Sequence, residues 1–257
     1  MGVKKQLKQI QKMIPAEWLV QVQNMHALLL SQWILHRESK QIVFNKKSAM
    51  VFSPHQDDET FGCGGMIALK REHNVPVTVA FLTDGRGSDP QIKDKIIEIR
   101  KQEAVTALKI LGVESSEIHF LEKQDGTLPD LETQERQKTI EQITKLLKFY
   151  KPEEVYVPHR KDCHKDHEAT YELVKEAIAQ AGMEVELLQY PIWMFWRAPI
   201  FILLKLQDIA AAYRVPIDSV QDKKYRAIAS YSSQLEGLPN GFVKQFSGSY
   251  EIFFKES

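Results

Sequence analysis

The sequence predicts an α/β protein with a mostly parallel sheet, and three observations support this. Short apolar runs that are typical of buried strands recur along the chain, for example at 77–82. Between them lie longer segments whose apolar residues are spaced by threes and fours, which predicts amphipathic helices. Polar loops follow several of the strands directly. Strands alternating with helices favour a parallel sheet with right-handed crossovers and helices on both faces.

The first element is a helical extension over residues 1–45. Its apolar positions are spaced mostly by threes and fours and are divided near Pro15, which interrupts a helix. These positions are Leu7, Ile10, Met13, Ile14, Trp18, Val22, Met25, Leu28, Leu29 and Ile34. We expect the extension to pack on the core as an arm, with residues 46–257 forming a single domain. A subunit contact would leave the same pattern in the sequence.

The main domain is expected to add strands and helices in turn. The predicted strands are an edge strand at 42–44 and then 49–53, 77–82, 118–121 and 155–157. The predicted helices are 66–70, opened by a glycine-rich turn at 61–65, and then 94–111, 139–150 and 169–181. Gly112 and Pro152 end two of these helices. The order predicts a three-layer, Rossmann-like fold. The aromatic stretch 190–204 reads as a core strand and a packed helix, although a rim facing substrate or lipid would have the same composition.

Composition narrows the function. The chain has 257 residues, with 34 Lys and Arg against 34 Asp and Glu, so no overall field attracts nucleic acid. Two cysteines are too few for a disulfide scaffold. No secretory signal is evident, and no run approaches the ~18 apolar residues of a membrane span. We therefore expect a soluble, cytoplasmic protein.

The first functional motif follows the predicted strand 49–53. His55, Asp57 and Asp58 come directly after it, where the carboxyl ends of parallel strands form a ligand-binding crevice. Adjacent carboxylates raise each other's pKa, so we expect either a cation between them or a division of roles. The glycine-rich turn that follows lacks the spacing of a dinucleotide fold and the Lys-Ser/Thr ending of a phosphate loop.

The second motif follows the strand 155–157. His164 and His167 are three residues apart across a helix start, so both imidazoles can point into one cleft. Asp166 between them could fix a histidine tautomer. Together with His55 and Asp58 they provide a His/Asp/His set of ligands with at least one position left for water. Such an open site is typical of catalytic zinc, and the same ligands suit Fe2+, Mn2+ or Co2+.

Several motifs, in order, resemble the PIG-L/LmbE-like family of zinc-dependent N-acetylglucosaminyl deacetylases. They are His55-Gln56-Asp57-Asp58-Glu59, Gly62-Cys63-Gly64-Gly65, Thr83-Asp84-Gly85, Arg100-Lys101-Gln102-Glu103-Ala104 with Leu111-Gly112, and His164-Lys165-Asp166-His167. The resemblance spans about residues 49–181 and extends to Lys224, Tyr231, Ser233 and Gln234. Gln56 is a departure, because the family usually has proline or alanine at this position.

The resemblance implies a role for each matching residue. His55, Asp58 and His167 would bind zinc, and Asp57 would be the general base. His164 would stabilise the oxyanion as a protonated imidazole, and Asp166 would orient a neighbouring histidine. Arg100 and Asp125 would contact the sugar, and Arg86, in the loop after strand 77–82, is a further candidate for substrate binding.

The resemblance implies removal of an acetyl group from an N-acetylglucosamine-type conjugate, either a small molecule or a glycolipid. A metal-dependent amidase acting on a thiol conjugate or another non-sugar amide is the alternative. A catalytically inactive glycan-binding module would lack a ligand or the base, and neither is missing. Phosphoester hydrolysis is disfavoured because no arginine cluster or second metal site accompanies the ligands.

Overall fold

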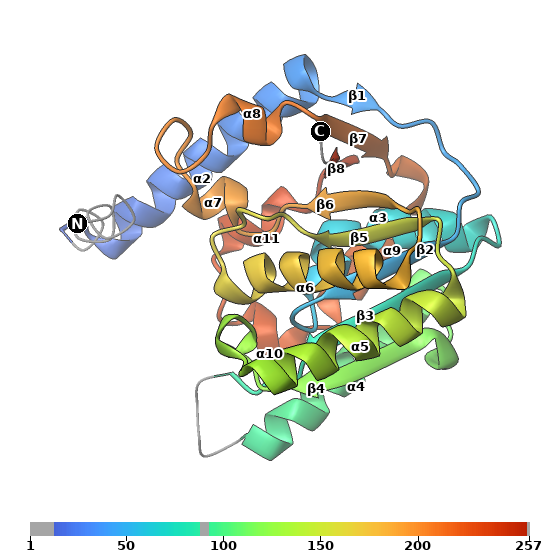
Figure 1. Cartoon of the computed structure of the whole chain (residues 1–257). Helices are drawn as coiled ribbons and strands as arrows, with labels where there is room; N and C mark the ends of the chain where they lie inside the picture. Colours follow the sequence, from blue (N-terminus) through green and yellow to red (C-terminus); the bar gives the residue numbers. More distant parts are fainter. Residues whose placement is uncertain (1–12, 88–92, 256–257) are drawn as a thin grey trace.

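A mixed sheet runs through the part of the molecule that the computed structural model describes, residues 13–87 and 93–255 (Figure 1). Its strands are β1 (Lys40–Gln41), β2 (Ala49–Ser53), β3 (Val77–Thr83), β4 (Ile118–Lys123), β5 (Glu154–Pro158), β6 (Glu186–Tyr190), β7 (Ala212–Pro216) and β8 (Tyr250–Lys255). Their order is β1-β7-β8-β6-β5-β2-β3-β4, and the neighbouring pairs are parallel except for the two that β8 makes. The predicted α/β fold with a mostly parallel sheet is confirmed.

Helices cover both faces of this sheet. The longer ones are α2 (Ala16–Trp33), α3 (Asp58–Glu72), α4 (Lys93–Leu111), α5 (Thr133–Tyr150), α6 (Lys165–Ala181) and α9 (Gln221–Ala229). The short ones are α7 (Met194–Arg197), α8 (Leu206–Ile209), α10 (Ser232–Leu235) and α11 (Asn240–Gln245). A π-helical turn at 34–38 continues α2, and single 3-10 turns lie at 115–117, 128–130 and 218–220.

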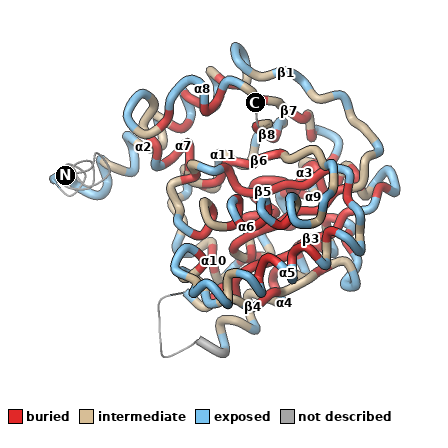
Figure 2. Tube along the Cα trace, viewed as in Figure 1, coloured by how far each residue is buried: buried red, intermediate tan, exposed pale blue. Residues whose placement is uncertain are grey.

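Alternation along the central strands divides the core in two. Met50 and Phe52 of β2 point to one face, where they pack with α5 and α6. Ala49 and Val51 point to the other face, where they join the larger cluster that contains α3 and α4. Both faces are therefore buried, as Figure 2 shows for the central strands, and this explains why the strands are continuous apolar runs.

The glycine-rich segment is where the helix prediction was wrong. Helix α3 begins at Asp58 and runs through all three glycines, whereas a turn was predicted there. A Cβ on Gly62 would lie 2.3 Å from the ring of Tyr190, and a Cβ on Gly65 would lie 2.5 Å from Ile217. The glycines therefore allow β6 and the segment after β7 to approach the helix closely.

Smaller differences concern element ends. The edge strand predicted at 42–44 is β1, two residues earlier, although Ile42 still donates its backbone N–H to the carbonyl of Arg214 over 2.9 Å. Helix α5 begins six residues before the predicted 139, and α6 begins four residues before the predicted 169. The earlier start of α6 places Asp166 and His167 in its first turn.

The described part of the N-terminal arm packs on the core as expected, through the contacts of α2 with α7 and α11. The predicted helical positions Leu7 and Ile10 lie outside the described residues. His26 fixes it there, accepting from Ile200 N at 3.3 Å and lying 2.9 Å from the carbonyl of Phe195. The stretch 190–204 belongs mostly to the core, since Trp196 is buried, while Trp193 is partly exposed. None of the helices in the described residues is both long and apolar enough to cross a membrane.

The fold predicts a loss of stability in acid, because His159 is buried directly after β5. Burial lowers its pKa from 6.5 to about 4. Between these two pH values the imidazole is therefore protonated in the unfolded chain and neutral in the folded chain. This group's contribution is complete above pH 6.5 and is lost as the pH falls toward 4. Between about pH 7 and pH 5 we expect a loss of about 2 kcal/mol. Urea unfolding at both pH values should show that the free energy of unfolding falls less in His159→Gln than in the native chain. An equal fall in the two proteins would contradict the assignment to His159.

Candidate metal centre and active-site cleft

The candidate site lies where the strand order reverses. From β2 the chain moves outward to β3 and β4 and then returns to the other side of β2 as β5. The segment after β2 carries His55 and Asp57, and the segment after β5 carries His164 as the N-cap of α6. These two segments diverge at the switch point, which is where ligands bind in open α/β sheets.

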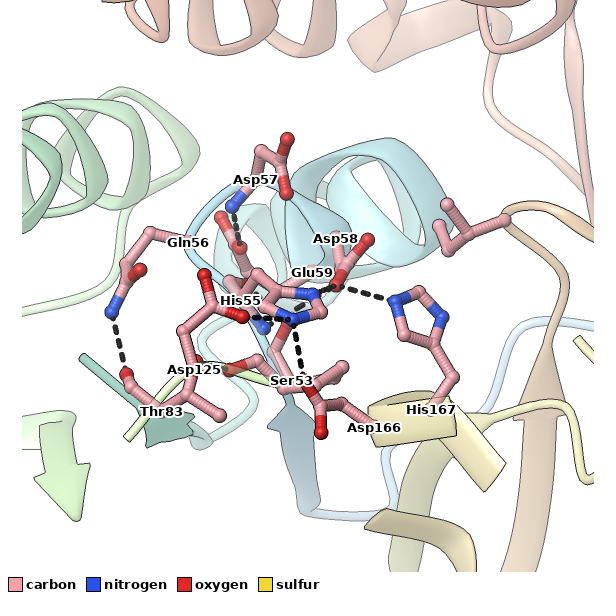
Figure 3. A network of polar contacts seen from close by, with 12 residues as sticks. Ser53, His55, Gln56, Asp57, Asp58, Glu59, Thr83, Asp125, Asp166 and His167 are labelled. Carbon is pink, nitrogen blue, oxygen red and sulfur yellow. Dashed lines mark hydrogen bonds and ion pairs between the residues drawn. The ribbon is translucent and has the colours of Figure 1, made fainter. Parts of the chain in front are cut away.

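One carboxylate oxygen holds the cluster together. Oδ2 of Asp58 lies 2.9 Å from Nδ1 of His55 and 3.1 Å from Nε2 of His167 (Figure 3). The backbone N–H of His55 also donates to this oxygen over 3.3 Å. The rings of His55 and His167 have centroids 5.3 Å apart. The structure thus brings together the three residues predicted to bind metal.

Two further carboxylates fix the other side of His55. Its Nε2 lies 3.2 Å from Oδ1 of Asp125 and 3.2 Å from Oδ2 of Asp166. Asp166 is itself fixed, because it accepts the backbone N–H groups of Gly126 and Leu128 over 2.8 and 3.1 Å. The histidine that Asp166 orients is therefore His55, which is far away in sequence, and Nδ1 of His55 is left to face Asp58.

His167 is held by Asp162, a residue to which the sequence analysis gave no role. Oδ2 of Asp162 lies 2.7 Å from Nδ1 of His167. The same carboxylate accepts three backbone N–H groups, from Ile192, Trp193 and Met194, over 2.8 to 2.9 Å. A carboxylate surrounded by donors requires Nδ1 to carry a proton, so in the neutral form of His167 the lone pair is on Nε2. The only signal in the sequence was the spacing of five residues.

The chemistry of Nε2 of His167 tests whether a metal fits. This atom is buried and has no hydrogen-bond partner among the described residues, although it faces the Asp58 carboxylate. In the neutral ring this lone pair would face an anion, which is unfavourable unless a proton or a metal cation lies between the two atoms. Other donor groups converge on His55 within 4.8 Å: His164 with His167, and Asp125 with Asp166. Mixed imidazole and carboxylate donors suit zinc and also iron, manganese or cobalt. The residues fit a divalent metal.

The pKa values of the same groups point the same way. Burial would lower the pKa of His167, but Asp58 and Asp162 outweigh it and raise that pKa to about 9. Burial is likewise outweighed at His55, whose pKa is held well above its usual range by Asp125, Asp166 and Asp58. The pKa of Asp58 is lowered, against its own burial, by the two imidazoles. The cluster therefore favours positive charge at its centre.

Asp57 differs from its neighbour Asp58. Its pKa is raised well above the usual range, first by burial and then by the charge of Asp58. Its backbone has φ of 143°, a conformation that costs about 1–3 kcal/mol in a residue with a side chain. The carbonyl of Asp57 accepts the first backbone N–H groups of α3, from Thr60 and Phe61. The start of α3 thus combines a strained backbone at Asp57 with a side-chain carboxyl group whose pKa is raised, and both lie beside the donor cluster.

His164 joins the cluster in a neutral form. Its ring lies 4.9 Å from that of His55 and 4.6 Å from that of His167, measured between centroids. Burial, followed by the charges of these two histidines, lowers its pKa to about 3. The expected protonated imidazole is therefore not what this environment favours. A neutral ring still has one N–H to donate.

A cleft of 330 Å³ opens onto these groups. It is lined by His55, Asp57, Asp58, Phe61, Arg100, Asp125, His164, Ile192, Trp193, Ser233, Gln234, Gly237, Leu238 and Phe242. Nε of Arg100 is buried and has no hydrogen-bond partner among the described residues. Arg86 is not part of this lining; its guanidinium pairs with Asp84, with Nε 2.8 Å from Oδ2. Of the residues predicted to bind substrate, the structure thus places Arg100 and Asp125 on the cleft.

Contacts from distant segments fix the cleft wall. Gln234 donates to the backbone carbonyl of Gln56 over 2.5 Å, and the side chain of Gln56 donates to the carbonyl of Thr83 over 2.9 Å. Gln56 is fully buried, so its role is to join two loops. Ser233 donates to Glu103 of α4 over 2.7 Å. The C-terminal residues included in the resemblance therefore close one side of the site.

The fold and the donor cluster together define an α/β protein with a cluster that could hold a metal ion at the carboxyl edge of its sheet. More particularly, the chain belongs to the PIG-L family: the family model described as GlcNAc-PI de-N-acetylase matches residues 50–178. The resemblance seen in the sequence is confirmed.

Individual relatives extend this finding. A probable N-acetyl-alpha-D-glucosaminyl L-malate deacetylase 2 of Bacillus subtilis is 30% identical over 208 residues, which cover 75% of this chain and 86% of that protein. A 4-oxalmesaconate hydratase of Pseudomonas putida is 28% identical over 204 residues, 74% of each chain. The solved structure of N,N'-diacetylchitobiose deacetylase from Pyrococcus horikoshii superposes with a TM-score of 0.62 at 21% identity, covering 82% of this chain and 84% of that one. At this identity the structural likeness supports the fold alone.

Proposed function

We propose that this chain is a metal-dependent deacetylase that hydrolyses the N-acetyl group of an N-acetylglucosamine-type sugar conjugate. The observation that carries the proposal is the position of Asp58 between His55 and His167, with Asp57 beside it on the cleft. This arrangement occurs in a chain that belongs to a family of de-N-acetylases. The Bacillus subtilis relative is named as a probable deacetylase of an N-acetylglucosaminyl conjugate, which supports the sugar over a non-sugar amide, whereas the hydratase relative is not named for an amino sugar.

The proposed metal ligands are His55, Asp58 and His167, and the proposed metal is zinc, with Fe2+, Mn2+ or Co2+ as alternatives. A divalent metal here supplies Lewis acidity to water and to an amide carbonyl. Asp57 accepts the proton of the attacking water, and its raised pKa suits that task. It then returns the proton to the amide nitrogen as the C–N bond breaks, giving acetate and a free amine.

Other residues position the reactants. The N–H of neutral His164 donates to the oxyanion that forms when water adds to the carbonyl carbon. Asp166 and Asp162 orient His55 and His167 through the contacts described above. Arg100 and Asp125, which both line the cleft, would hold sugar hydroxyls or an anionic substituent.

The domain bounds, the substrate class and the location in the cell are also proposals. We propose residues 46–257 as the deacetylase domain and residues 1–45 as an extension added to it. The substrate would be a small or lipid-linked amino sugar. A cytoplasmic location is still a prediction from the sequence.

Metal reconstitution with several substrates tests the proposal. Protein stripped of metal should release acetate from an N-acetylglucosaminyl conjugate only after Zn2+, Fe2+, Mn2+ or Co2+ is restored. The substrates should include N-acetylglucosaminyl malate, diacetylchitobiose and N-acetylated amides that contain no sugar. Acetate release from the sugars supports the proposal and ranks their substituents. If the metal binds stoichiometrically and only non-sugar amides are cleaved, the amidase alternative is correct instead.

The two arginines predicted to bind substrate should behave differently. Arg100→Gln should raise KM by about tenfold or more, because the substrate loses a charged hydrogen-bond donor on the cleft. Arg86→Gln is the matched control, since Arg86 pairs with Asp84 and is not among the residues that line the cleft. Steady-state kinetics on the best substrate measure both. An equal rise in KM for the two variants would contradict the assignment of Arg100.

A further inference from the structure

Helix α2 carries two apolar stripes, and only one of them is used within the molecule. The inner stripe contains Ala27 and Leu30, and Ile34 in the following turn continues it into the core. The outer stripe consists of Trp18, Val22, Met25 and Leu29, spaced by four, three and four residues. These side chains are 68%, 54%, 58% and 67% exposed. A single apolar stripe is enough to pack a surface helix, so the outer one is available to a partner.

A neighbouring loop extends this surface. Phe201, Ile202 and Leu206 are exposed, and they follow Ile200, whose backbone N–H donates to His26 of α2. The start of this loop therefore lies beside α2 at one end of the molecule (Figure 1). In Figure 2 this end is coloured mainly as exposed. We call the residues of the outer stripe together with Phe201, Ile202 and Leu206 the outer apolar surface.

Charge favours one kind of partner for this surface. The N-terminal extension, residues 1–45, contains six Lys or Arg and two Asp or Glu, although the whole chain is balanced at 34 of each. Four of these bases, Lys4, Lys5, Lys8 and Lys12, precede α2 in sequence and lie outside the described residues. Lys205, in the loop, is exposed. A second copy of the chain would bring like charges together, whereas anionic lipid headgroups would complement them.

We propose that the outer apolar surface binds an anionic lipid bilayer, with α2 lying in the plane of the interface. Amphipathic helices with flanking basic residues bind in this way, through apolar burial and attraction to headgroups. The surface is close to the cleft, because α2 packs on α7 and α11, and Phe242 of α11 lines the cleft. Membrane binding would thus hold the cleft near the interface. The inference does not depend on the proposed deacetylase activity.

Vesicle flotation tests the proposal with the full chain. The native chain should float with vesicles containing about one-third phosphatidylglycerol and not with pure phosphatidylcholine vesicles. Binding should weaken as NaCl rises from about 0.05 to about 0.5 M, because salt screens the headgroups. Met25→Ser with Leu29→Ser should reduce the bound fraction by about tenfold, since both apolar side chains leave the interface.

Matched controls separate the surface from the fold. Gln21→Ser with Gln32→Ser places two serines on exposed polar positions of the same helix and should leave binding unchanged. Circular dichroism and turnover of a soluble N-acetylated sugar should match the native chain for both double variants. If the native chain does not float, or if the two double variants lose binding equally, the proposal is wrong. If the native chain does not float and Met25→Ser with Leu29→Ser converts a dimer to a monomer in sedimentation, the surface is a subunit contact instead.

Discussion

Replacing Asp57 by Asn should lower kcat by about a hundredfold to ten-thousandfold, the usual contribution of a general base. The amide has nearly the same shape but cannot accept a proton from water. The metal should remain bound, because Asp57 makes none of the contacts that join His55, Asp58 and His167. Rate measurements should therefore be paired with metal analysis of the same sample. Near-native turnover with a full complement of metal would show that another group is the base.

The strain at Asp57 provides an independent control. The backbone of Asp57 lies outside the left-handed helical region in which Asn and Asp are enriched, so Asn keeps the strain of the native residue, whereas glycine relieves it. Both variants also remove a carboxylate whose pKa is raised by burial and by Asp58. Asp57→Asn and Asp57→Gly should therefore unfold at the same temperature as the native chain or higher while being inactive. Loss of activity accompanied by a lower Tm would instead indicate that the variants simply disturb the fold.

Asp162→Asn should weaken metal binding by about ten- to a hundredfold, because residues that hold a metal-ligating histidine have effects of that size. The Asn amide nitrogen would meet either Nδ1–H of His167 or one of the backbone N–H groups at 192–194, so a donor would face a donor. If the proton moves to Nε2 of His167, this atom no longer has a lone pair with which to bind a metal beside Asp58. Competition with a chelator of known affinity measures the change.

Asp208→Asn is the matched control for this variant. Asp208 is also a buried carboxylate near β5, but it pairs with Arg160 and Lys161 instead of a histidine of the cluster. Both variants should lose stability, since each removes a buried charge from its partners. Only Asp162→Asn should lose metal affinity. Equal affinities for the two variants would remove Asp162 from the metal site.

Local patterns in the sequence predicted the central sheet well. The strands β2 and β3 are continuous apolar runs with both faces buried, and such runs leave little choice of structure. The glycines at 62–65 led to the wrong prediction of a turn, because they serve a tertiary contact. Nothing in the local sequence shows that Tyr190 and Ile217 pack against them. The start of α6 was missed for a related reason, since His164 caps it without a side-chain hydrogen bond.

The candidate site was predictable only in part. Motifs identified the groups on the loops after β2 and β5, because each motif is contiguous. The partners of these groups were harder to find, since Asp166 contacts His55 across 111 residues and Gln234 contacts Gln56 across 178. The prediction for α2 was incomplete for a similar reason, because the sequence identified its apolar positions as one set. The sequence alone could not show that Ala27 and Leu30 pack inward while Trp18 and Leu29 face outward.

The position of β8 has a consequence for the cooperativity of the fold. β8 is antiparallel to both its neighbours, and in the sheet order it is the link between β7 with β1 on one side and β6 on the other. Opening the β6–β8 pairing would separate the outer three strands from the parallel half, which carries the proposed metal ligands, and would leave Glu251 of β8 as a link to α3. We therefore expect the amide hydrogens of this outer leaf to exchange with solvent together and sooner than those of β2, β3 and β5. The parallel part of the sheet, β6-β5-β2-β3-β4, would then stay paired during local opening of the outer strands.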